Sequence, residues 1–447
     1  MAKFFQPKSR ALPGPLELDV TGFSSEGRGI AHHQGKAVFI EGALPGERVL
    51  AKFVSAASGV LQAVAAKVLQ AAPERCPPGC EIASQCGGCD WLHIASDQQL
   101  AWKQQLLLEQ LARKLPLADA DIAEPISSPS WGYRSRTRLA YWRDKSNHWA
   151  LGFRAAGSKS VVPISHCPVL TPPLTSILPW LQKALRQIGA IVGLGHVELI
   201  DAEGRQAVLL RAVKPLSESA LTALLGAANA AGFDLWLQSG DDSPQCLNQT
   251  ENPLYYYSLP AFALRIGYAV TDFSQVNQAV NQAMISQAIN WMAGALPNLD
   301  QAQVLDLFCG VGNFSLPIAR QAGQVVGIEV SETMVERAQE NAEQNGIENA
   351  SFAAADLAGD EFNGPWLNQT YDAVLLDPPR AGAKGALPLI RKLRIPVLVY
   401  VSCNPATFVR DAEQLVSYGY QLQRVGVMDM FPQTKHVECM ALFRRLN

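Results

Sequence analysis

Short, predominantly apolar segments alternate with helix-like segments from about residue 300 onward, and this alternation most constrains the fold. The apolar segments are 304–308, 325–329, 373–377 and 397–401, and the helical patterns cover 315–321, 332–345 and 406–417. Strands that lack polar residues on either face are typical of a parallel sheet covered by helices on both sides. The sequence therefore predicts a Rossmann-like α/β domain at the C-terminal end.

A glycine turn, Gly310-x-Gly312, follows the first of these strands. Such a turn lets a ligand approach the backbone closely. Glu329 ends the second strand about twenty residues further on, where doubly wound folds place a carboxylate for ribose hydroxyls. Enzymes that bind NAD share this geometry, so the turn alone does not identify the ligand.

The residues around the turn favour S-adenosylmethionine over a dinucleotide. The third glycine of the dinucleotide fingerprint is missing, and Asn313 follows the second glycine. The run from Asp306 through Phe308 to Phe314 instead has the form that methyltransferases use. Asp356 follows the third strand, where it is placed to meet the adenine amino group.

Three further elements bear on which atom is methylated. The run Asp377-Pro378-Pro379-Arg380 resembles the turn with which amino-methylating enzymes hold an exocyclic amine, so N-methylation of adenine or guanine is one candidate. Cys403 lies where a strand gives way to a helix, which exposes the thiol at the active face, and the helix N-terminus is expected to stabilise a thiolate. Glu438 provides a carboxylate in a hairpin-like C-terminal end.

A thiolate and a carboxylate base are the groups that methylation of uracil at C5 requires. C5 is a poor nucleophile until a thiolate adds to C6, and a base must then remove the C5 proton so that the thiol is eliminated. The alternative is that Cys403 has no catalytic role and is a thiol packed in the core. The position of Cys403 at a strand end, before Asn404-Pro405, argues against this alternative. Cytosine methylation uses similar chemistry, yet the usual Pro-Cys motif is missing.

The N-terminal part has a different residue pattern from the C-terminal part. Five short strand patterns with glycines between them lie between residues 12 and 70 and suggest a small barrel of the OB type, although any small β domain fits the pattern. A helix is expected from Asp97 to Leu115, and helix-like stretches cover 174–188 and 217–231. Arginines, lysines and aromatic residues interleave between Trp131 and Ser160, which suits either an RNA surface or a solvated basic face.

Length and composition indicate a soluble protein of two or three domains. The chain has 447 residues, 48% of them hydrophobic and 17% charged, and a net charge of −3. No apolar run is long enough for a membrane span, and Pro7 and Lys8 interrupt any signal-peptide pattern. We therefore expect a cytoplasmic protein. Nine cysteines in such a chain favour metal binding or catalysis over disulfides.

Taken together, the chain resembles the bacterial uracil-C5 RNA methyltransferases, and among them the 23S rRNA branch with an N-terminal TRAM domain and a [4Fe–4S] cluster. The resemblance rests on several motifs spread over nearly the whole chain. They are Gly132-Tyr133-Arg134, Gly195-His196-Val197-Glu198-Leu199, Asp272-Phe273-Ser274-Gln275-Val276-Asn277, the run from Ser402 to Thr407, and His436-Val437-Glu438.

The resemblance implies roles for individual residues. Cys403 is the nucleophile and Glu438 is the base. The family's positions for cofactor and uracil fall on Gln275, Phe308, Asn313, Glu329, Asp356 and Asp377. Phe273 stacks on a flipped base and Arg138 lies near the target. Cys80, Cys86, Cys89 and Cys167 ligate the cluster, with Cys76 as an extra thiol upstream; by spacing alone, zinc is the alternative metal.

The resemblance also implies the organisation and partners of the chain. Residues 10–70 form the TRAM domain, 71–265 an iron–sulfur segment with a central RNA-binding α+β domain, and 266–447 the methyltransferase domain, on which the helix near 97–115 docks. The substrate is 23S ribosomal RNA, with uracil 1939 as the target, and we expect a monomer with no DNA or membrane partner. The alternatives are another rRNA or tRNA uridine, or an inactive iron–sulfur RNA-binding protein.

Overall fold

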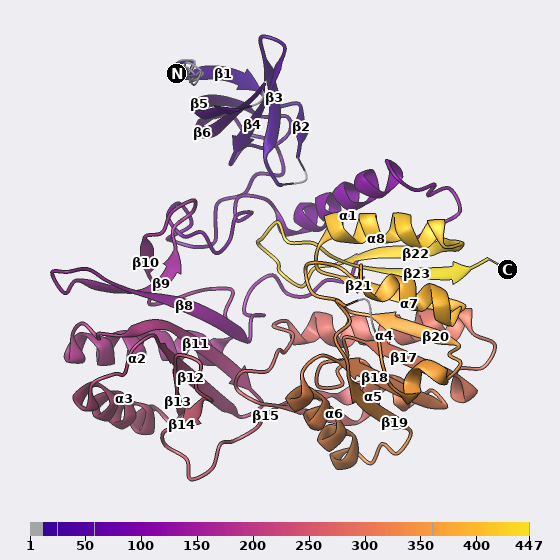
Figure 1. The fold of residues 1–447 in the computed structure, drawn as a ribbon. Coiled ribbons are helices and arrows are strands. Elements are labelled where there is room, and N and C mark those ends of the chain that lie inside the picture. Colours follow the sequence, from indigo (N-terminus) through magenta and orange to yellow (C-terminus); the bar gives the residue numbers. More distant parts are fainter. Residues whose placement is uncertain (1–11, 25, 58, 360–361, 447) are drawn as a thin grey trace, which may run out of the picture. The chain divides into compact units, whose positions relative to one another are not determined.

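The computed structural model describes residues 12–24, 26–57, 59–359 and 362–446, and its fold is drawn in Figure 1. The N-terminal segment considered above for a signal peptide and the start of the expected 10–70 domain lie outside these residues. Internal contacts divide the chain into two compact units. Of the described residues, the smaller unit comprises those from 12 to 83, 89–102 and 433–435, and the larger unit comprises 84–88, those from 103 to 432, and 436–446.

The smaller unit is built on a six-stranded sheet with the order β1-β5-β6-β4-β3-β2. Its strands are β1 (Leu16–Asp19), β2 (Gly22–Phe23), β3 (Gly29–His33), β4 (Lys36–Glu41), β5 (Arg48–Ala57) and β6 (Val60–Gln70). The five strand patterns expected from the sequence are present, and the two-residue β2 is an addition. Alternate residues of these strands, such as Val38 and Ile40, are fully buried and form a separate small core.

A buried carboxylate joins this sheet to the segment that follows it. Glu47 is 1% exposed and accepts hydrogen bonds from the Leu44 and Ala72 amides and from the Arg75 guanidinium, whose Nε lies 2.5 Å from Oε1. Burial opposes ionisation of Glu47, but these bonds outweigh it and hold the pKa of the carboxyl below its usual value. The smaller unit also contains the start of α1 (Ser96–Ala112), close to the helix expected at 97–115.

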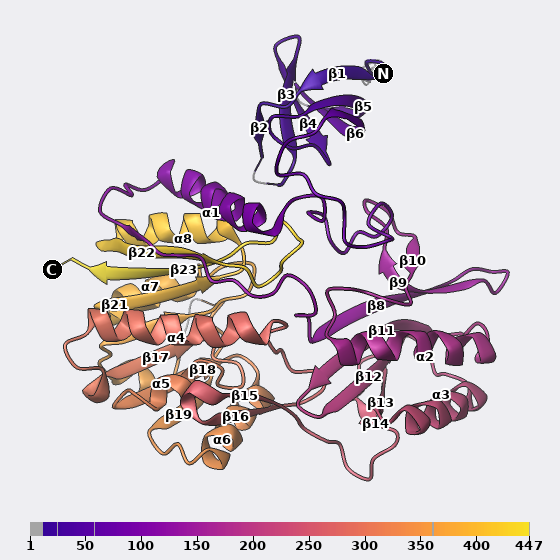
Figure 2. The same cartoon turned by 180° about the vertical axis from the view of Figure 1, so that it is seen from behind.

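The middle of the larger unit is a seven-stranded sheet with the order β10-β9-β8-β11-β12-β13-β14. The strands are β8 (Arg136–Arg143), β9 (Trp149–Arg154), β10 (Val161–Pro163), β11 (Leu194–Ala202), β12 (Arg205–Ala212), β13 (Asp234–Ser239) and β14 (Gln245–Cys246). Two helices, α2 (Pro172–Ile188) and α3 (Glu218–Ala231), cover one face of this sheet (Figure 2). Both helices agree with the sequence expectation, and together with the sheet they make a central α+β region.

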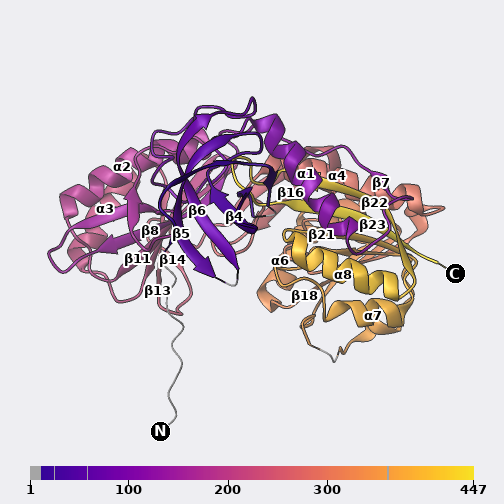
Figure 3. The same cartoon turned by 90° about the horizontal axis from the view of Figure 1, so that it is seen from above.

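The C-terminal part of the larger unit is an eight-stranded sheet with the order β19-β18-β17-β20-β21-β23-β22-β7. Its strands are β17 (Gln303–Leu307), β18 (Gln324–Glu329), β19 (Ala350–Ala354), β20 (Ala373–Leu376), β21 (Val397–Ser402), β22 (Tyr420–Met428), β23 (Glu438–Arg445) and β7 (Asp121–Ile122). The helices are α4 (Gln278–Ala295), α5 (Ser315–Ala319), α6 (Glu332–Gln344), α7 (Ala386–Leu393) and α8 (Pro405–Ser417). The view from above places α4 on one side of the strands and α7 and α8 on the other (Figure 3).

This sheet confirms the predicted mixed α/β architecture and differs from it at one end. β17 to β21 pair in parallel, but β23 runs antiparallel to both β21 and β22. A hairpin, β22–β23, is therefore inserted beside the last parallel strand. A hairpin between β15 (Tyr255–Leu259) and β16 (Leu264–Tyr268) precedes α4. Within the described residues, no helix is both long and apolar enough to cross a membrane.

Candidate active site at the carboxyl ends of the parallel strands

The predicted cofactor and catalytic residues lie at the ends of successive strands of the C-terminal sheet. Phe308 follows β17, Glu329 ends β18, Asp356 follows β19, Asp377 follows β20 and Cys403 follows β21. The carboxyl ends of parallel strands meet at one edge of a sheet, which is where open α/β folds bind ligands. The structure thus brings these five residues, far apart in sequence, to a single edge.

The turn after β17 has the backbone of a ligand cradle. Phe308, a non-glycine residue, has φ 69°, and Gly310 and Gly312 have φ 56° and 93°. Strain of this kind at a non-glycine residue gathers at functional sites. A Cβ on Gly312 would lie 3.0 Å from Leu316 Cγ, so the turn also needs a small residue there. Glu329 reaches back to the turn and accepts a hydrogen bond from the Gly310 amide at 3.2 Å.

The side chain of Asn313 is held in a small polar network. Its Oδ1 accepts hydrogen bonds from the Tyr257 hydroxyl at 2.7 Å and from Asn281 Nδ2 at 3.0 Å. Its Nδ2 in turn donates to Asn281 Oδ1 at 3.0 Å. Because Asn281 is fully buried in α4, this network fixes the orientation of the turn.

Asp306 is a site residue that the sequence reasoning mentioned only as part of a motif. It is fully buried, and its Oδ2 accepts a hydrogen bond from Ser315 Oγ at 2.5 Å. Oδ1 is also buried and has no hydrogen-bond partner in the described part of the chain. Burial raises the pKa of this carboxyl to about 7. The signal was present in the sequence, since Asp306 is the single charged residue in an otherwise apolar strand.

Gln275 and Phe273 lie in the segment that leads into α4. Gln275 is 8% exposed, whereas Phe273 is 66% exposed, which is unusual for so large an apolar ring. α4 begins at Asn277, whose side chain accepts a hydrogen bond from the Val280 amide and donates to Ser128 Oγ at 2.8 Å. The cap therefore anchors the segment that carries both predicted site residues.

Cys403 and Glu438 are brought together by strand pairing. β21 and β23 are antiparallel neighbours, and Ser402 is directly opposite Cys439 in their register. The residues that follow Ser402 and precede Cys439, namely Cys403 and Glu438, therefore lie at the same end of this strand pair. Asn404 caps the next helix by accepting a hydrogen bond from the Ala406 amide.

The electrostatic surroundings of Cys403 differ from the sequence expectation. The helix N-terminus was expected to favour the thiolate, but the pKa of the thiol is raised above its usual value. Burial is the largest cause, and the carboxylates of Glu438 and Asp377 add to it, while Arg380 opposes them. The expectation considered only the helix and missed two carboxyls delivered by distant parts of the chain.

Glu438 is buried and is surrounded by charged groups from several elements. Burial raises its pKa to about 8, with further increases from Asp377 and Asp429 and decreases from Arg380 and Lys103. Lys103, on α1, is completely buried and donates to Asp429 Oδ1 at 2.7 Å and to the Phe431 carbonyl at 3.1 Å. Burial likewise raises the pKa of Asp377 to about 7.

The remaining predicted residues come from other elements of the chain. Arg138, on β8, donates from Nε to Glu198 Oε1 at 2.8 Å. Cys80 and Cys89 belong to the smaller unit, whereas Cys86 and Cys167 belong to the larger one. Within the described ranges, no three His, Cys, Asp or Glu side chains form a group that could hold a metal ion. The predicted cluster ligation is therefore not seen in the structure.

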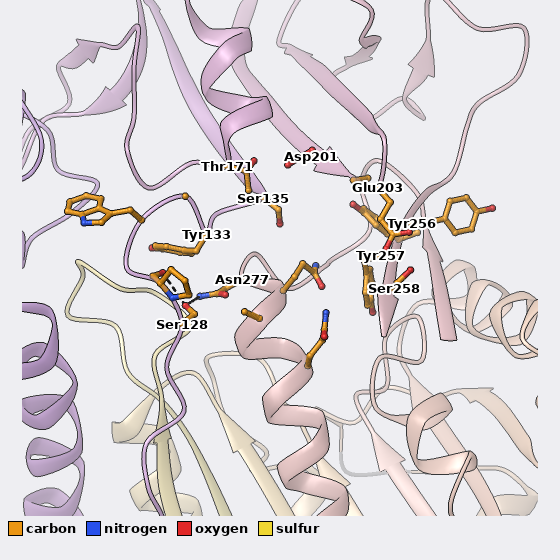
Figure 4. Close-up of a pocket in the computed structure, with 18 residues that line it drawn as sticks. Ser128, Tyr133, Ser135, Thr171, Asp201, Glu203, Tyr256, Tyr257, Ser258 and Asn277 are labelled. Carbon is orange, nitrogen blue, oxygen red and sulfur yellow. Dashed lines mark hydrogen bonds between the residues drawn. The ribbon is translucent and has the colours of Figure 1, made fainter. Parts of the chain in front are cut away.

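A cavity of about 490 Å³ lies in the larger unit (Figure 4). Tyr133, Tyr256, Tyr257 and Asn277 are among the residues that line it, and the predicted catalytic and cofactor residues are not. Two of its tyrosines donate hydrogen bonds to segments of the candidate active site. Besides the bond from Tyr257 to the turn, the Tyr133 hydroxyl donates to the Pro432 carbonyl at 3.0 Å, within the loop that leads to β23.

Comparison with known proteins agrees with this geometry. The family model described as tRNA (Uracil-5-)-methyltransferase matches residues 95–446, which is most of the chain. The chain belongs to this family. It is therefore a methyltransferase, and the resemblance inferred from the sequence is confirmed. A second model, the TRAM domain, matches residues 16–66, which fall within β1 to β6.

Curated relatives and a solved structure extend this assignment. The 23S rRNA (uracil(1939)-C(5))-methyltransferase RlmD of Shewanella halifaxensis is 42% identical over the full length of both chains. The protein of the same name from Pseudomonas fluorescens is 44% identical over 95% of this chain and 91% of its own. The fold of this uracil-5 methyltransferase also resembles that of the Pyrococcus abyssi tRNA (uracil-54, C5)-methyltransferase, with a TM-score of 0.73, 22% identity, and coverage of 96% and 99% of the two chains.

Proposed function

We propose that this protein methylates C5 of uracil 1939 in 23S rRNA, with S-adenosylmethionine as methyl donor, Cys403 as nucleophile and Glu438 as proton acceptor. The names of the full-length relatives support the substrate. The observation that carries the mechanism is the placement of a thiol and a buried carboxyl at the same end of the β21–β23 pair. Both groups are needed for addition to C6 and removal of the C5 proton.

The residues at the sheet edge fit the proposed methyl donor. Gly310 and Gly312 leave room for a ligand against the backbone. Glu329 would hold the ribose hydroxyls, Asp356 the adenine, and Gln275, Phe308, Asn313 and Asp377 the rest of the ligand. The unpartnered Oδ1 of Asp306 is suited to a cationic group, and S-adenosylmethionine carries both an ammonium and a sulfonium. When bound, it supplies the methyl group that C5 accepts.

The buried carboxyls predict how binding of S-adenosylmethionine depends on pH. Asp306 and Asp377, each with a pKa of about 7, are largely protonated at pH 6, and a cationic ligand favours their ionised forms. The affinity is therefore expected to rise from pH 6 to pH 8, with each carboxyl that must ionise adding up to about tenfold per pH unit below its pKa. Titration calorimetry measures this, and Asp306→Asn should flatten the profile. An affinity that does not change over this range would contradict the assignment.

The chain's own residues then carry out the proton and thiol steps. Cys403 adds to C6 of uracil as a thiolate, and the C4–C5 edge becomes an enolate that accepts the methyl group at C5. Glu438 next takes the C5 proton, the C5–H electrons re-form the C5–C6 double bond, and the Cys403 thiolate leaves. Because the pKa of Glu438 is about 8 in the unliganded protein, the base must be ionised by the time of this last step.

The buried pair Lys103–Asp429 predicts two opposite shifts in the pH dependence of the last step. Lys103 lowers the pKa of Glu438 and Asp429 raises it. Lys103→Met should therefore move the rise in the rate of adduct resolution to higher pH, and Asp429→Asn should move it to lower pH. Single-turnover kinetics between pH 6 and 9.5 measure both midpoints. General damage from an unpaired buried charge would slow both variants without opposite shifts, and the double variant controls for loss of the pair.

The uracil has to leave folded RNA to reach this edge. The exposed ring of Phe273 is placed to stack on an extruded base, and Arg138 would lie near the target nucleotide.

Trapping with 5-fluorouridine tests the whole proposal, since fluorine at C5 blocks proton removal and leaves the thiol attached to C6. We expect a denaturation-stable adduct with a 23S rRNA fragment that contains 5-fluorouridine at position 1939, and none with a tRNA T-loop. An adduct only with the tRNA would identify the family's other substrate class, and no adduct with either RNA would refute the mechanism.

We further propose that Cys80, Cys86, Cys89 and Cys167 ligate a [4Fe–4S] cluster. The proposal is supported by the thiolate donor set, its spacing and the family resemblance. Around Cys86, Gly87 donates to the Arg154 carbonyl at 2.9 Å and the Gly88 amide lies 3.4 Å from Sγ, a geometry that orients the sulfur. Anaerobic purification followed by iron and sulfide analysis should give four of each per chain. Zinc without iron would contradict the proposal.

The division of the chain and its setting complete the proposal. We propose that residues 10–70 act as a TRAM domain, 71–265 as the iron–sulfur and central RNA-binding region on β8 to β14, and 266–447 as the methyltransferase domain. We also propose that the protein works as a monomer in the cytoplasm, with rRNA as its macromolecular partner.

A further inference from the structure

The face of the central sheet that α2 and α3 leave uncovered carries a cluster of arginines. The cluster consists of Arg136, Arg138 and Arg211 around Glu198. Strand register places these residues on one face of the sheet, because Glu198 lies opposite Arg138 and His196 lies opposite Arg211. The neighbouring residues in sequence point to the other face, where Val197 and Leu199 are fully buried. The Gly195–Leu199 motif noted in the sequence therefore contributes apolar residues to the core and polar residues to this face.

One carboxylate organises three guanidinium groups in this cluster. Arg138 donates to Glu198 Oε1 from Nε at 2.8 Å and from a terminal nitrogen at 2.5 Å. Arg211 donates to the same oxygen, and Arg136 donates to Oε2 at 3.2 Å. Burial opposes ionisation of Glu198, but the bonds from Arg211 and Arg138 and the charge of Arg136 hold its pKa below the usual value. Glu198 is therefore ionised and fixes the positions of the arginines.

The cluster carries excess positive charge at an accessible surface. In the part of the chain that the structure describes, the ion pairs of these three arginines all go to Glu198, so three positive charges face one negative charge. The side chain of Arg138 is 54% exposed and that of Arg211 is 27% exposed, whereas Glu198 is 4% exposed. The cations thus face solvent and the anion lies beneath them.

The lowered pKa of His196 is consistent with a positive potential at this surface. Its pKa is lowered, first by burial and then by the charges of Arg138, Arg154 and Arg211, and Glu198 only partly opposes them. Arg154 is the last residue of β9 and lies on the same face as Arg138 by the pairing of β8, β9 and β10. The cationic surface therefore extends across several strands, towards the basic segment between Trp131 and Ser160.

The same cluster is tied to the segment that carries Phe273. Arg136 donates to the Asp272 carbonyl at 2.5 Å and to the Val270 carbonyl at 2.8 Å. Asp272 immediately precedes Phe273 and Val270 lies two residues before Asp272, and the side chain of Arg136 is only 15% exposed. Arg136 is thus a structural link, and Arg138 and Arg211 are the more exposed members, although Arg211 also donates to Gln238 Oε1.

We infer that the Glu198-centred arginine cluster is a binding site for a backbone phosphodiester of the RNA substrate, with Arg138 and Arg211 as the contacting residues. The inference rests on the proposed function for its ligand. Guanidinium groups match phosphate oxygens in charge, and Arg138 and Arg211 each carry N–H groups beyond those that bond to Glu198 and Gln238. A buried carboxylate that holds the forks in place reduces the entropy lost on binding, and contacts to phosphate position RNA without reading its sequence. The link through Arg136 would place this anchor next to the stacked uracil.

The salt dependence of RNA binding tests this inference. Each phosphate contact adds close to one to the slope of log K against log of salt concentration, so Arg211→Gln should reduce the slope by about 1 and weaken binding by about tenfold at low salt. Arg211→Lys keeps the charge and should keep the slope. Arg205→Gln is the matched control, because Arg205 also lies on β12 but pairs one to one with Asp234, which leaves no excess charge.

The outcomes separate this inference from the proposed function. A slope for Arg211→Gln equal to that of wild type and of Arg205→Gln overturns the phosphate site, whatever the enzyme methylates. Failure of the wild-type protein to methylate 23S rRNA, measured in parallel, overturns the proposed function instead. Competition with inorganic phosphate identifies the ligand's source: weak competition at millimolar concentration supports an RNA phosphodiester, and tight binding of inorganic phosphate alone contradicts it. Thermal melting of each variant shows that it is folded.

Discussion

Replacement of Cys403 by alanine is expected to abolish both methylation and the 5-fluorouridine adduct, with a loss of at least about 10⁴-fold in rate, because no other group can activate C5. Binding of S-adenosylmethionine should persist, since the turn after β17 and its network with Tyr257 are untouched. Because the raised pKa of Cys403 keeps its side chain uncharged in the free protein, its replacement leaves no unpaired charge, and the variant should fold normally. Methyl incorporation from labelled donor and equilibrium dialysis measure the two properties separately.

Cys439→Ala provides the matched control for this loss of a thiol. Cys439 is fully buried next to Glu438, and neighbours on a strand face opposite ways. Its replacement should keep the adduct, although the small cavity will cost some stability. An adduct that survives in the Cys403 variant and disappears in the Cys439 variant would mean that the wrong sulfur has been assigned.

Glu438→Gln is expected to stop the reaction after methyl transfer. The amide cannot take the C5 proton, so the methylated RNA stays bonded to Cys403 and turnover falls by about 10²- to 10⁴-fold. Because glutamine has nearly the same shape, the β21–β23 pairing should be kept. Denaturing electrophoresis with RNA and labelled methyl donor should show a band that contains protein, RNA and the label.

The pH profile provides the control for the glutamate variant. Wild type should show a rise in adduct resolution towards pH 8, as the pKa of Glu438 requires, and the variant should show none. Glu438→Asp keeps a carboxyl on a shorter side chain and should turn over slowly without a stable band. Rapid turnover by Glu438→Gln, or absence of the trapped complex, would assign the base to another group.

The C-terminal sheet was largely predictable because each of its parallel strands is marked by residues within or next to that strand. Apolar runs, the glycine turn and residues at strand ends placed β17, β18, β20 and β21 within one residue of their observed bounds, whereas β19 was expected only as a strand before Asp356. α4 was not predicted, since glutamine, asparagine and apolar residues mix along Gln278–Ala295 without a strong stripe, and its start depends on the Asn277 cap. A hairpin-like C-terminal end was expected around Glu438 and is present as β22–β23, but no bounds were predicted for β22.

The charged neighbours of the candidate site could not be predicted, because they come from remote parts of the chain. Lys103 pairs with Asp429 across 326 residues, and both influence Glu438. A lysine within a helix pattern reads as solvent-exposed, yet this one is completely buried. The sign of the Cys403 pKa shift was wrong for the same reason. A sequence motif shows which residues carry the chemistry, whereas the strength of an acid depends on neighbours that only the fold assembles.

The smaller unit includes three residues, Gln433 to Lys435, from the loop just before the strand that begins with Glu438. The Gln433 carbonyl accepts a hydrogen bond from the Trp91 amide, and its side-chain Oε1 accepts one from Gln99 Nε2. The Gln433 amide donates to Gln99 Oε1, and the Lys435 amide donates to Asp90 Oδ1. The boundary between the two compact units therefore does not fall at a single position in the sequence. A fragment that begins at residue 103 would keep every proposed catalytic group yet lose the partners of this loop, so truncation from the N-terminus is not a neutral way to isolate the enzyme's chemistry.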